Sequence, residues 1–352
     1  MPDRTPELRE QVSEAAAAGT PIAPIGTGSK GFLGNPCPVR PLSTAGHEGV
    51  IDYMPGELVV RVRAGTPLAD LERVLAAEGQ RLAFDPPVFP PGGTVGGALC
   101  AGLAGPGRPW LGSVRDHVLG LCMIDGKGEV LRFGGQVMKN VAGYDVSRTL
   151  CGSLGSLGLV LDVDLRVLPR PEKTVALHFE LGAEAALAQL ARWQRRPWPI
   201  TGAAWVAGRL HVRLSGASAA VDAARRQLGG EEERPAFWSA LRDQSLEFFR
   251  HRESRTLWRL SVPAMAPVTG HELEDLLIDW GGAQRWVLAD PEDEAPLRLA
   301  RTLGGHAQRF RQSPPERPWQ SLSPTLLWLN QQIKRSFDPA GIFNPGRLHA
   351  GC

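Results

Sequence analysis

Clustered cysteines are missing from this sequence. Its 352 residues include five cysteines, and no two of them form a C-x-x-C pair. Iron–sulfur clusters and structural zinc sites need several ligands at close spacing. The sequence therefore predicts no metal site within the chain, and we expect its thiols to be reduced packing residues. The five are Cys37, Cys100, Cys122, Cys151 and Cys352.

A strong charge imbalance and a long apolar run are also missing. The formal net charge is +2, and 43% hydrophobic with 22% charged residues is ordinary for a globular protein. There is no basic stripe of the kind that binds nucleic acid. No segment is apolar enough to cross a bilayer, and the N-terminal residues predict a polar helix rather than a signal peptide. We therefore expect a cytoplasmic protein that binds no nucleic acid.

Glycine, in contrast, is abundant at 41 residues and clusters before Pro171. The run at 26–31, GTGSKG, matches the G-x-G-x-x-G pattern of dinucleotide-binding proteins. A Rossmann fold needs a helix directly after this pattern, and the glycine and prolines of the following FLGNPCP forbid one. The loop still suits an anion, because its backbone N–H groups can converge on phosphate and Lys30 adds a positive charge.

Two further glycine-rich loops follow in the same half of the chain. Residues 90–97 read PPGGTVGG, and residues 152–158 read GSLGSLG directly before a strand. Each loop alone could be an ordinary turn. Three of them need another reason, because ordering glycine is entropically costly. A long dinucleotide that lies against all three loops supplies one.

Alternating apolar residues predict strands at 57–64, 118–125, 129–134 and 158–169, with a turn at 126–128 between the second and third. A helix is expected after the first strand, with Thr66 as its N-cap, Pro67 at its first position and Gly79 as its stop. Its buried face is expected to comprise Leu68, Leu71, Val74 and Leu75.

The sequence changes in character after Pro171. Nine of the ten tryptophans lie beyond Arg192, and strand-like and helix-like runs alternate, which predicts a second α+β domain. The tryptophan and arginine content of 192–259 fits a core with a charged surface, or a contact with a partner subunit. The segment 289–318 is rich in proline and charge and is expected to be a long loop.

The glycine loops, taken with two later motifs, resemble the FAD-binding domain of the vanillyl-alcohol oxidase/p-cresol methylhydroxylase (PCMH) family. The matching runs are PIGTGSKGFLG, GGTVGGALCAG, LGSVRDHVLGL, CGSLGSLGLV and FDPAGIFNPGRL. The resemblance implies an α+β fold with a two-subdomain PCMH-type FAD-binding domain at 1–171. It also implies a smaller α+β, cap-like domain at 172–330 and a tail at 331–352 that returns to the flavin.

Within that family, the runs VMKNVAGYDVSRTLCGS, LWRLSVP and SFDPAGIFNPGRLH resemble the FAD-binding E subunits of multi-subunit glycolate oxidases (glycolate dehydrogenases). The resemblance implies an FAD-dependent oxidoreductase subunit of an enzyme that oxidises glycolate to glyoxylate. It implies two partners, a second related flavin subunit and an iron–sulfur subunit, with membrane contact only through them. Three alternatives stay open: electron relay alone, an independent dehydrogenase of another 2-hydroxy acid or a sugar lactone, and an assembly subunit that binds little FAD.

The sequence departs from the family pattern at two places. Leu111 stands where the family usually has an aromatic residue, and only its neighbour Trp110 is aromatic. Ser29 stands where members with covalent flavin carry a histidine, so the resemblance implies non-covalent FAD.

The resemblance assigns cofactor contacts to residues of each motif. Those of the first loop would hold the pyrophosphate, those of the second the ribityl and flavin, and the remainder the middle of the cofactor, the adenine side and the isoalloxazine. They are Gly26, Thr27, Gly28, Ser29, Lys30, Gly92, Gly93, Thr94, Gly96, Gly97, Ser113, Asp116, Gly152, Ser153, Gly155, Gly158, Val160 and Asn344.

Catalytic residues are harder to assign. Related catalytic subunits carry a His-Gly-Asp-Gly-Asn-type run in the second domain, and this sequence has none. Lys139, near Asn140 and Tyr144, could stabilise a reduced flavin, or could be a loop lysine paired with an acid. Arg259 is a candidate for an anion contact, whereas the lone His211 favours a structural role.

Overall fold

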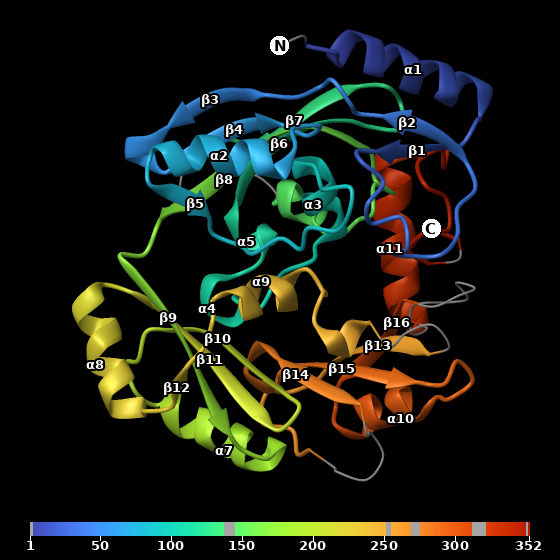
Figure 1. The fold of residues 1–352 in the computed structure, drawn as a ribbon. Coiled ribbons are helices and arrows are strands. Elements are labelled where there is room, and N and C mark those ends of the chain that lie inside the picture. The colour runs from blue at the N-terminus through green and yellow to red at the C-terminus, as the bar shows by residue number, and fades with distance from the viewer. Residues whose placement is uncertain (1–2, 137–144, 251–254, 269–274, 312–321, 350) are drawn as a thin grey trace. The chain divides into compact units, whose positions relative to one another are not determined.

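The computed structural model describes residues 3–136, 145–250, 255–268, 275–311, 322–349 and 351–352 (Figure 1). The chain forms two compact units. The first comprises 1–103, 113–170 and 321–352, and the second comprises 104–112 and 171–320. The second unit thus includes the segment 104–112, which the sequence analysis assigned to the first domain.

The first unit is built on a six-stranded sheet, in which the order β3-β4-β8-β6-β7 is completed by β5 pairing with β8. Every pairing in it is antiparallel. One face packs on α2 and α3, where Leu71, Val62, Leu99 and Val163 share one apolar core. The strands are β3 Val50–Met54, β4 Val59–Arg63, β5 Gln80–Leu82, β6 Val118–Ile124, β7 Val130–Gly134 and β8 Leu159–Pro169. The helices and 3-10 turn of this part are α2 Leu68–Ala77, α3 Val95–Ala101, α5 Val114–His117, α6 Val146–Thr149 and η1 Pro55–Glu57.

A second, smaller core joins the two ends of the chain. Parallel strands β1 (Ile22–Ile25) and β2 (Arg40–Ser43) pack with α1 (Thr5–Ala18). The tail that follows α11 (Pro324–Phe337) adds Ile342 and Phe343 to the same core. Ile22 also forms a parallel bridge with Phe343. The C-terminal tail is therefore part of the first unit's framework.

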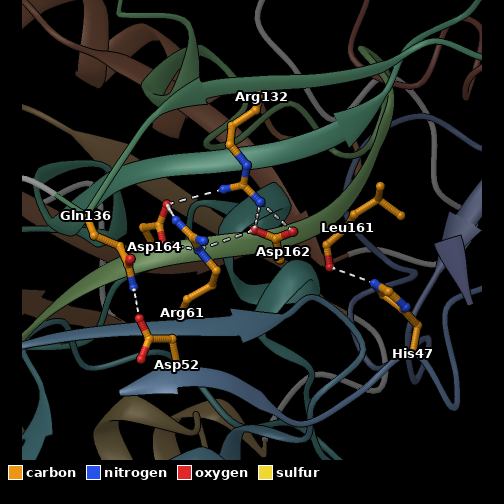
Figure 2. A network of polar contacts seen from close by, with 8 residues as sticks. All are labelled: His47, Asp52, Arg61, Arg132, Gln136, Leu161, Asp162 and Asp164. Atoms are coloured by element: carbon orange, nitrogen blue, oxygen red, sulfur yellow. Dashed lines mark hydrogen bonds and ion pairs between the residues drawn. The ribbon is translucent and has the colours of Figure 1, made fainter. Parts of the chain in front are cut away.

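The outer face of the six-stranded sheet carries a network of paired charges (Figure 2). Asp164 is fully buried, and its carboxylate accepts from Arg61 at 2.6 Å and from Arg132 at 3.5 Å. Arg132 also donates to Asp162 at 2.8 Å. Pairing of this kind is what a buried carboxylate requires, because an uncompensated charge inside a protein is strongly destabilising. The carboxylate of Asp164 raises the pKa of Arg61.

The second unit is an eight-stranded sheet of order β12-β9-β11-β10-β14-β15-β13-β16. Its strands are β9 Lys173–Glu180, β10 Ile200–Val206, β11 Arg209–Gly216, β12 Glu231–Glu232, β13 Thr256–Ser261, β14 Leu276–Asp279, β15 Gln284–Ala289 and β16 His306–Arg311. Its helices and 3-10 turns are α4 Arg108–Leu111, α7 Ala183–Trp193, α8 Ser218–Leu228, α9 Ala236–Arg242, α10 Ala295–Thr302, η2 Glu247–Phe249 and η3 Trp280–Gly282. Separate apolar clusters cover the α7/α8 half and the α10 half of the sheet.

Most of the elements expected from the sequence are present, including the β6–β7 hairpin with its turn at 126–128. Three expectations were wrong. Pro67, not Thr66, is the N-cap of α2, because the Thr66 hydroxyl accepts from the Gly49 N–H at 2.8 Å instead. Val74 is 39% exposed. The segment 289–318 was expected to be a long loop, but its described residues, 289–311, contain α10 and β16. No helix among the described ranges is long and apolar enough to cross a membrane.

Candidate FAD site

The first glycine loop leaves β1 at its carboxyl end and turns without forming a helix, as the sequence predicted. Gly28 has a φ of +73°, which a residue with a side chain adopts only with strain. Within the described residues, the backbone N–H groups of Thr27, Gly28 and Ser29 donate to no protein acceptor. Three successive unpaired N–H groups form a nest of the kind that binds phosphate oxygens.

The second loop is fastened to the first. The Thr27 hydroxyl donates to the Gly92 carbonyl at 2.8 Å, and the Thr94 hydroxyl caps α3 by accepting from the Gly97 N–H at 3.1 Å. A Cβ added at Gly26 would lie 2.4 Å from the Thr94 Oγ1. Glycine at 26 is therefore needed for the two loops to meet, whether or not a cofactor is bound.

The third loop meets the C-terminal tail at Asn344. The Asn344 side chain is buried, and its Nδ2 donates to the Leu154 carbonyl at 2.8 Å. Its Oδ1 is buried without a hydrogen-bond partner among the described residues. A buried acceptor of this kind destabilises the fold unless a donor forms a hydrogen bond with it. An N–H or hydroxyl group of a ligand can supply that donor.

Lys334 on α11 fixes this tail. Its ammonium donates to the Ser156 and Phe343 carbonyls at 2.7 and 2.6 Å and to the Asp338 carboxylate at 2.6 Å. Asp338 in turn accepts from the N–H groups of Ile342 and Phe343 at 3.0 and 2.7 Å. Lys334 and Asp338 are both buried, so this pair ties the third loop to the residues that lead into Asn344. Neither residue could be foreseen from the sequence, because α11 has no feature that marks a buried lysine.

One cavity of about 220 Å³ collects residues from all three loops and the tail. That volume is smaller than a typical small-molecule site, so a dinucleotide would extend beyond it. Twelve of the expected residues line it: Gly26, Thr27, Gly28, Ser29, Lys30, Thr94, Gly96, Gly97, Gly155, Gly158, Val160 and Asn344. Six do not line it: Gly92, Gly93, Ser113, Asp116, Gly152 and Ser153.

Four of the six residues off the cavity have visible local roles. Ser113 and Asp116 form a capping box at the start of α5, in which the Asp116 carboxylate accepts from the Ser113 N–H at 2.7 Å. Gly93 leaves room for Lys30, whose Nζ would lie 3.1 Å from an added Cβ. Gly152 supports the third loop through a bond from its N–H to the Leu99 carbonyl at 3.0 Å.

The charges at the cavity favour an anionic ligand. Lys30 lines it, and so does Arg347, a residue that the sequence analysis missed although it directly follows the Asn-Pro-Gly run. Burial lowers the pKa of Arg347, whose guanidinium donates to the Gly31 carbonyl at 2.8 Å. Burial also raises the pKa of the Cys100 thiol to about 11, so this cavity residue is neutral at pH 7.

The expected catalytic candidates that the structure describes do not line the cavity. Lys139, Asn140 and Tyr144 fall outside the described residues. Arg259 lies on β13 of the second unit and donates to Gln308 at 2.7 Å. His211 is 2.7 Å from the Glu233 carboxylate and stacks on Phe237, which agrees with a structural role.

Comparisons with known proteins agree with this geometry. Residues 1–134 match a family model described as an FAD binding domain. The chain is 46% identical to the glycolate oxidase subunit GlcE of Escherichia coli over 348 residues, covering 99% of the chain and 98% of that protein. It is 29% identical to the glycolate oxidase subunit GlcD of Bacillus subtilis over 184 residues, covering 51% of the chain and 39% of that protein.

A solved structure of alkyldihydroxyacetonephosphate synthase superposes with a TM-score of 0.68 at 17% identity, covering 97% of the chain and 76% of that structure. At this identity the match concerns the fold alone. It supports a PCMH-like FAD-binding fold for the three loops and the returning tail.

Proposed function

The chain belongs to the glycolate oxidase subunit GlcE family, and from that premise we propose that it holds FAD, without a covalent bond, in the three-loop groove, the site formed by the three glycine loops and the C-terminal tail. It is an FAD-dependent oxidoreductase subunit that acts on CH–OH groups, and its assembly oxidises glycolate to glyoxylate. One observation carries the siting of the cofactor: three glycine loops and Asn344 converge on one cavity that two cationic side chains line.

The residues of the groove suit the parts of FAD. The unpaired N–H groups at 27–29, with Lys30 and Arg347, suit the pyrophosphate, since glycine nests and cations bind phosphate together. The Asn344 Oδ1 would accept from a cofactor donor. When bound, FAD supplies the hydride acceptor for oxidation of the CH–OH group. The chain's own part is to bind and orient it.

The assembly supplies the second part of the proposal. The chain resembles both GlcE and GlcD, which supports a related flavin subunit as one partner. We also place an iron–sulfur subunit in the assembly. Among the described residues, no three histidine, cysteine or acidic side chains are grouped to hold a metal ion, so onward electron transfer is assigned to that partner. Membrane contact, on this proposal, is made through the partners.

FAD is expected to come off the purified chain on acid denaturation. No histidine lines the cavity within the described residues, and burial raises the pKa of both thiols that line it, Cys37 and Cys100, the latter to about 11. A neutral thiol is a poor nucleophile toward the flavin ring. The measurement is flavin absorbance in the supernatant and pellet after acid precipitation. Fluorescent flavin that migrates with the polypeptide on a denaturing gel would refute non-covalent binding.

The isolated, FAD-loaded chain is expected to oxidise glycolate slowly or not at all, whereas the assembly with its partners turns it over. The His-Gly-Asp-Gly-Asn-type run of related catalytic subunits is absent from the sequence. The assay uses an artificial electron acceptor, which replaces the missing partner. Rapid turnover by the isolated chain would instead favour a self-sufficient dehydrogenase of a 2-hydroxy acid. FAD content, measured on both samples, separates slow chemistry from lost cofactor.

A further inference from the structure

Arg259 lies on the face of the second sheet that is turned away from α10. Side chains alternate along a strand, so its neighbours Trp258 and Leu260 occupy the opposite face, where they join the core around α10. The register places Arg259 between Trp286 of β15 and Gln308 of β16. Arg259 is thus a cation set into an otherwise apolar and amide-bearing surface.

The guanidinium of Arg259 is held by neutral groups. Its Nη2 donates to the Gln308 Oε1 at 2.7 Å, and its Cζ lies 5.4 Å from the centre of the Phe310 ring. Gln308 and Phe310 are 3% and 2% exposed, and Phe310 packs edge-on against Trp286, so the support is rigid. No carboxylate within the described residues forms an ion pair with Arg259. A guanidinium has five N–H donors, and a single protein acceptor satisfies one of them.

Two other arginines of the chain have structural roles that their hydrogen-bond acceptors explain. Arg61 is matched by the buried carboxylate of Asp164. Arg285 is 1% exposed and donates to the carbonyls of Ala266 and Pro267 at 2.5 and 2.9 Å, which anchors that loop. Among the described residues, neither a carboxylate nor a backbone carbonyl accepts a hydrogen bond from Arg259.

The charges near Arg259 are also positive. Burial, and secondly the charge of Arg108, lower the pKa of Arg259 to about 10. Arg108 stacks on Trp280 with its Cζ 4.4 Å from the ring centre. His306, two residues before Gln308, has its pKa lowered by burial and then by Arg259, so it is neutral at pH 7.

We propose that Arg259, held by Gln308 and Phe310, is an anion subsite that binds the carboxylate of a small 2-hydroxy acid. A planar guanidinium pairs with a carboxylate through two parallel hydrogen bonds, and it does so most strongly where water is partly excluded. The choice of a 2-hydroxy acid rests on the proposed function. The existence of the subsite rests on the geometry of the second unit alone.

The experiment is calorimetric titration of the FAD-loaded chain with oxalate, at constant ionic strength set by chloride. Oxalate carries the carboxylate but has no CH–OH group to oxidise, so it binds without turnover. Arg259→Gln is expected to weaken oxalate binding about 10- to 100-fold, as loss of a charge-assisted hydrogen-bonded pair does. Gln308→Glu is expected to weaken oxalate binding to the same extent while keeping Arg259, because the carboxylate introduced at position 308 would pair with the Arg259 guanidinium in place of oxalate.

Arg309→Gln is the matched control. Arg309 directly follows Gln308 on β16 and lies on the opposite face of the sheet. There its Cζ is 4.8 Å from the centre of the Trp258 ring. Arg309→Gln removes a charge of the same kind from β16, the strand that pairs with β13 and carries Gln308, and should leave oxalate affinity unchanged. Unchanged affinity in Arg259→Gln or in Gln308→Glu would overturn the proposal. So would equal loss in the control, or oxalate binding no tighter than chloride in the wild type.

Flavin content of each sample separates this proposal from the proposed function. A flavin-free chain that binds oxalate through Arg259 would contradict the FAD site and leave the subsite standing. An FAD-loaded chain that ignores oxalate would contradict only the subsite. Because Gln308→Glu adds an ion pair, its fold is expected to be retained even where Arg259→Gln is less stable.

Discussion

Gly155→Trp is expected to abolish FAD binding while the chain stays folded. Gly155 lines the cavity, and its added Cβ would lie 3.2 Å from the Asn344 Nδ2 and 3.7 Å from Pro24, so the substitution meets side chains rather than a rigid backbone. An indole there fills the space that the cofactor needs. The measurement is flavin bound per chain after gel filtration, with circular dichroism as the check on folding.

Gly152→Trp is the matched control for that variant. Gly152 has a φ of +82° against +69° for Gly155, so both substitutions strain the backbone alike. An added Cβ at Gly152 meets nothing within 4 Å, and the residue does not line the cavity. Full FAD content in both variants would show that the third loop lies away from the cofactor. Gly96→Trp is a poorer test, because its Cβ would lie 2.7 Å from the Ala64 Cβ and would disturb the fold itself.

Lys334→Met is expected to cost about 3–5 kcal/mol of the free energy of unfolding, as the loss of one partner of a buried ion pair does. Methionine leaves the Asp338 carboxylate buried without its cation, and leaves the Ser156 and Phe343 carbonyls without a donor. FAD affinity should fall as well, because the same contacts hold the tail that carries Asn344. Thermal unfolding with and without added FAD measures both effects.

Arg335→Met tests the same change one residue along α11, where the side chain is exposed. Its unfolding temperature should stay close to that of the wild type. Adding Asp338→Asn to Lys334→Met should recover part of the loss, since asparagine removes the unpaired charge and its single side-chain oxygen can still accept from one of the Ile342 and Phe343 N–H groups. A Lys334→Met chain as stable as Arg335→Met would refute the structural role given to this pair.

The strands and turns of the first unit could be predicted because their signals are local. The β6–β7 hairpin follows from alternation around a glycine turn, and the end of α2 follows from Gly79, whose φ is +64°. The N-terminus of α2 could not be predicted in the same way. Thr66 has the chemistry of a cap, yet a tertiary contact with Gly49 takes its hydroxyl.

The segment 289–318 shows a different limit. Its prolines and charges favour a loop, but Pro296 lies in the first turn of α10, where proline is tolerated. Leu299 and Ala300 then give the helix an apolar face against the sheet, and β16 completes that edge. Composition alone does not reveal such a face, because the helix is stabilised mainly by packing its apolar residues against the sheet.

The glycine loops show how far the candidate site could be foreseen. Their clustering indicated one extended ligand, and twelve of the expected residues line one cavity. Sequence could not tell which glycines the protein itself requires. Gly158 is an example, since its added Cβ would lie 2.3 Å from the Met123 side chain and 2.7 Å from the Ile124 carbonyl. Lys334 and Arg347 were missed because their roles depend on contacts across more than 150 residues of chain.

Flavin counting on the purified chain is the most direct test of FAD binding in the three-loop groove. The chain is purified with FAD present, gel-filtered to remove free cofactor, and denatured in acid to release what it holds. The expected result is a yellow protein that releases close to one FAD per chain in the wild type and in Gly152→Trp, and none in Gly155→Trp. A colourless wild-type chain, or equal flavin in Gly155→Trp, would contradict it.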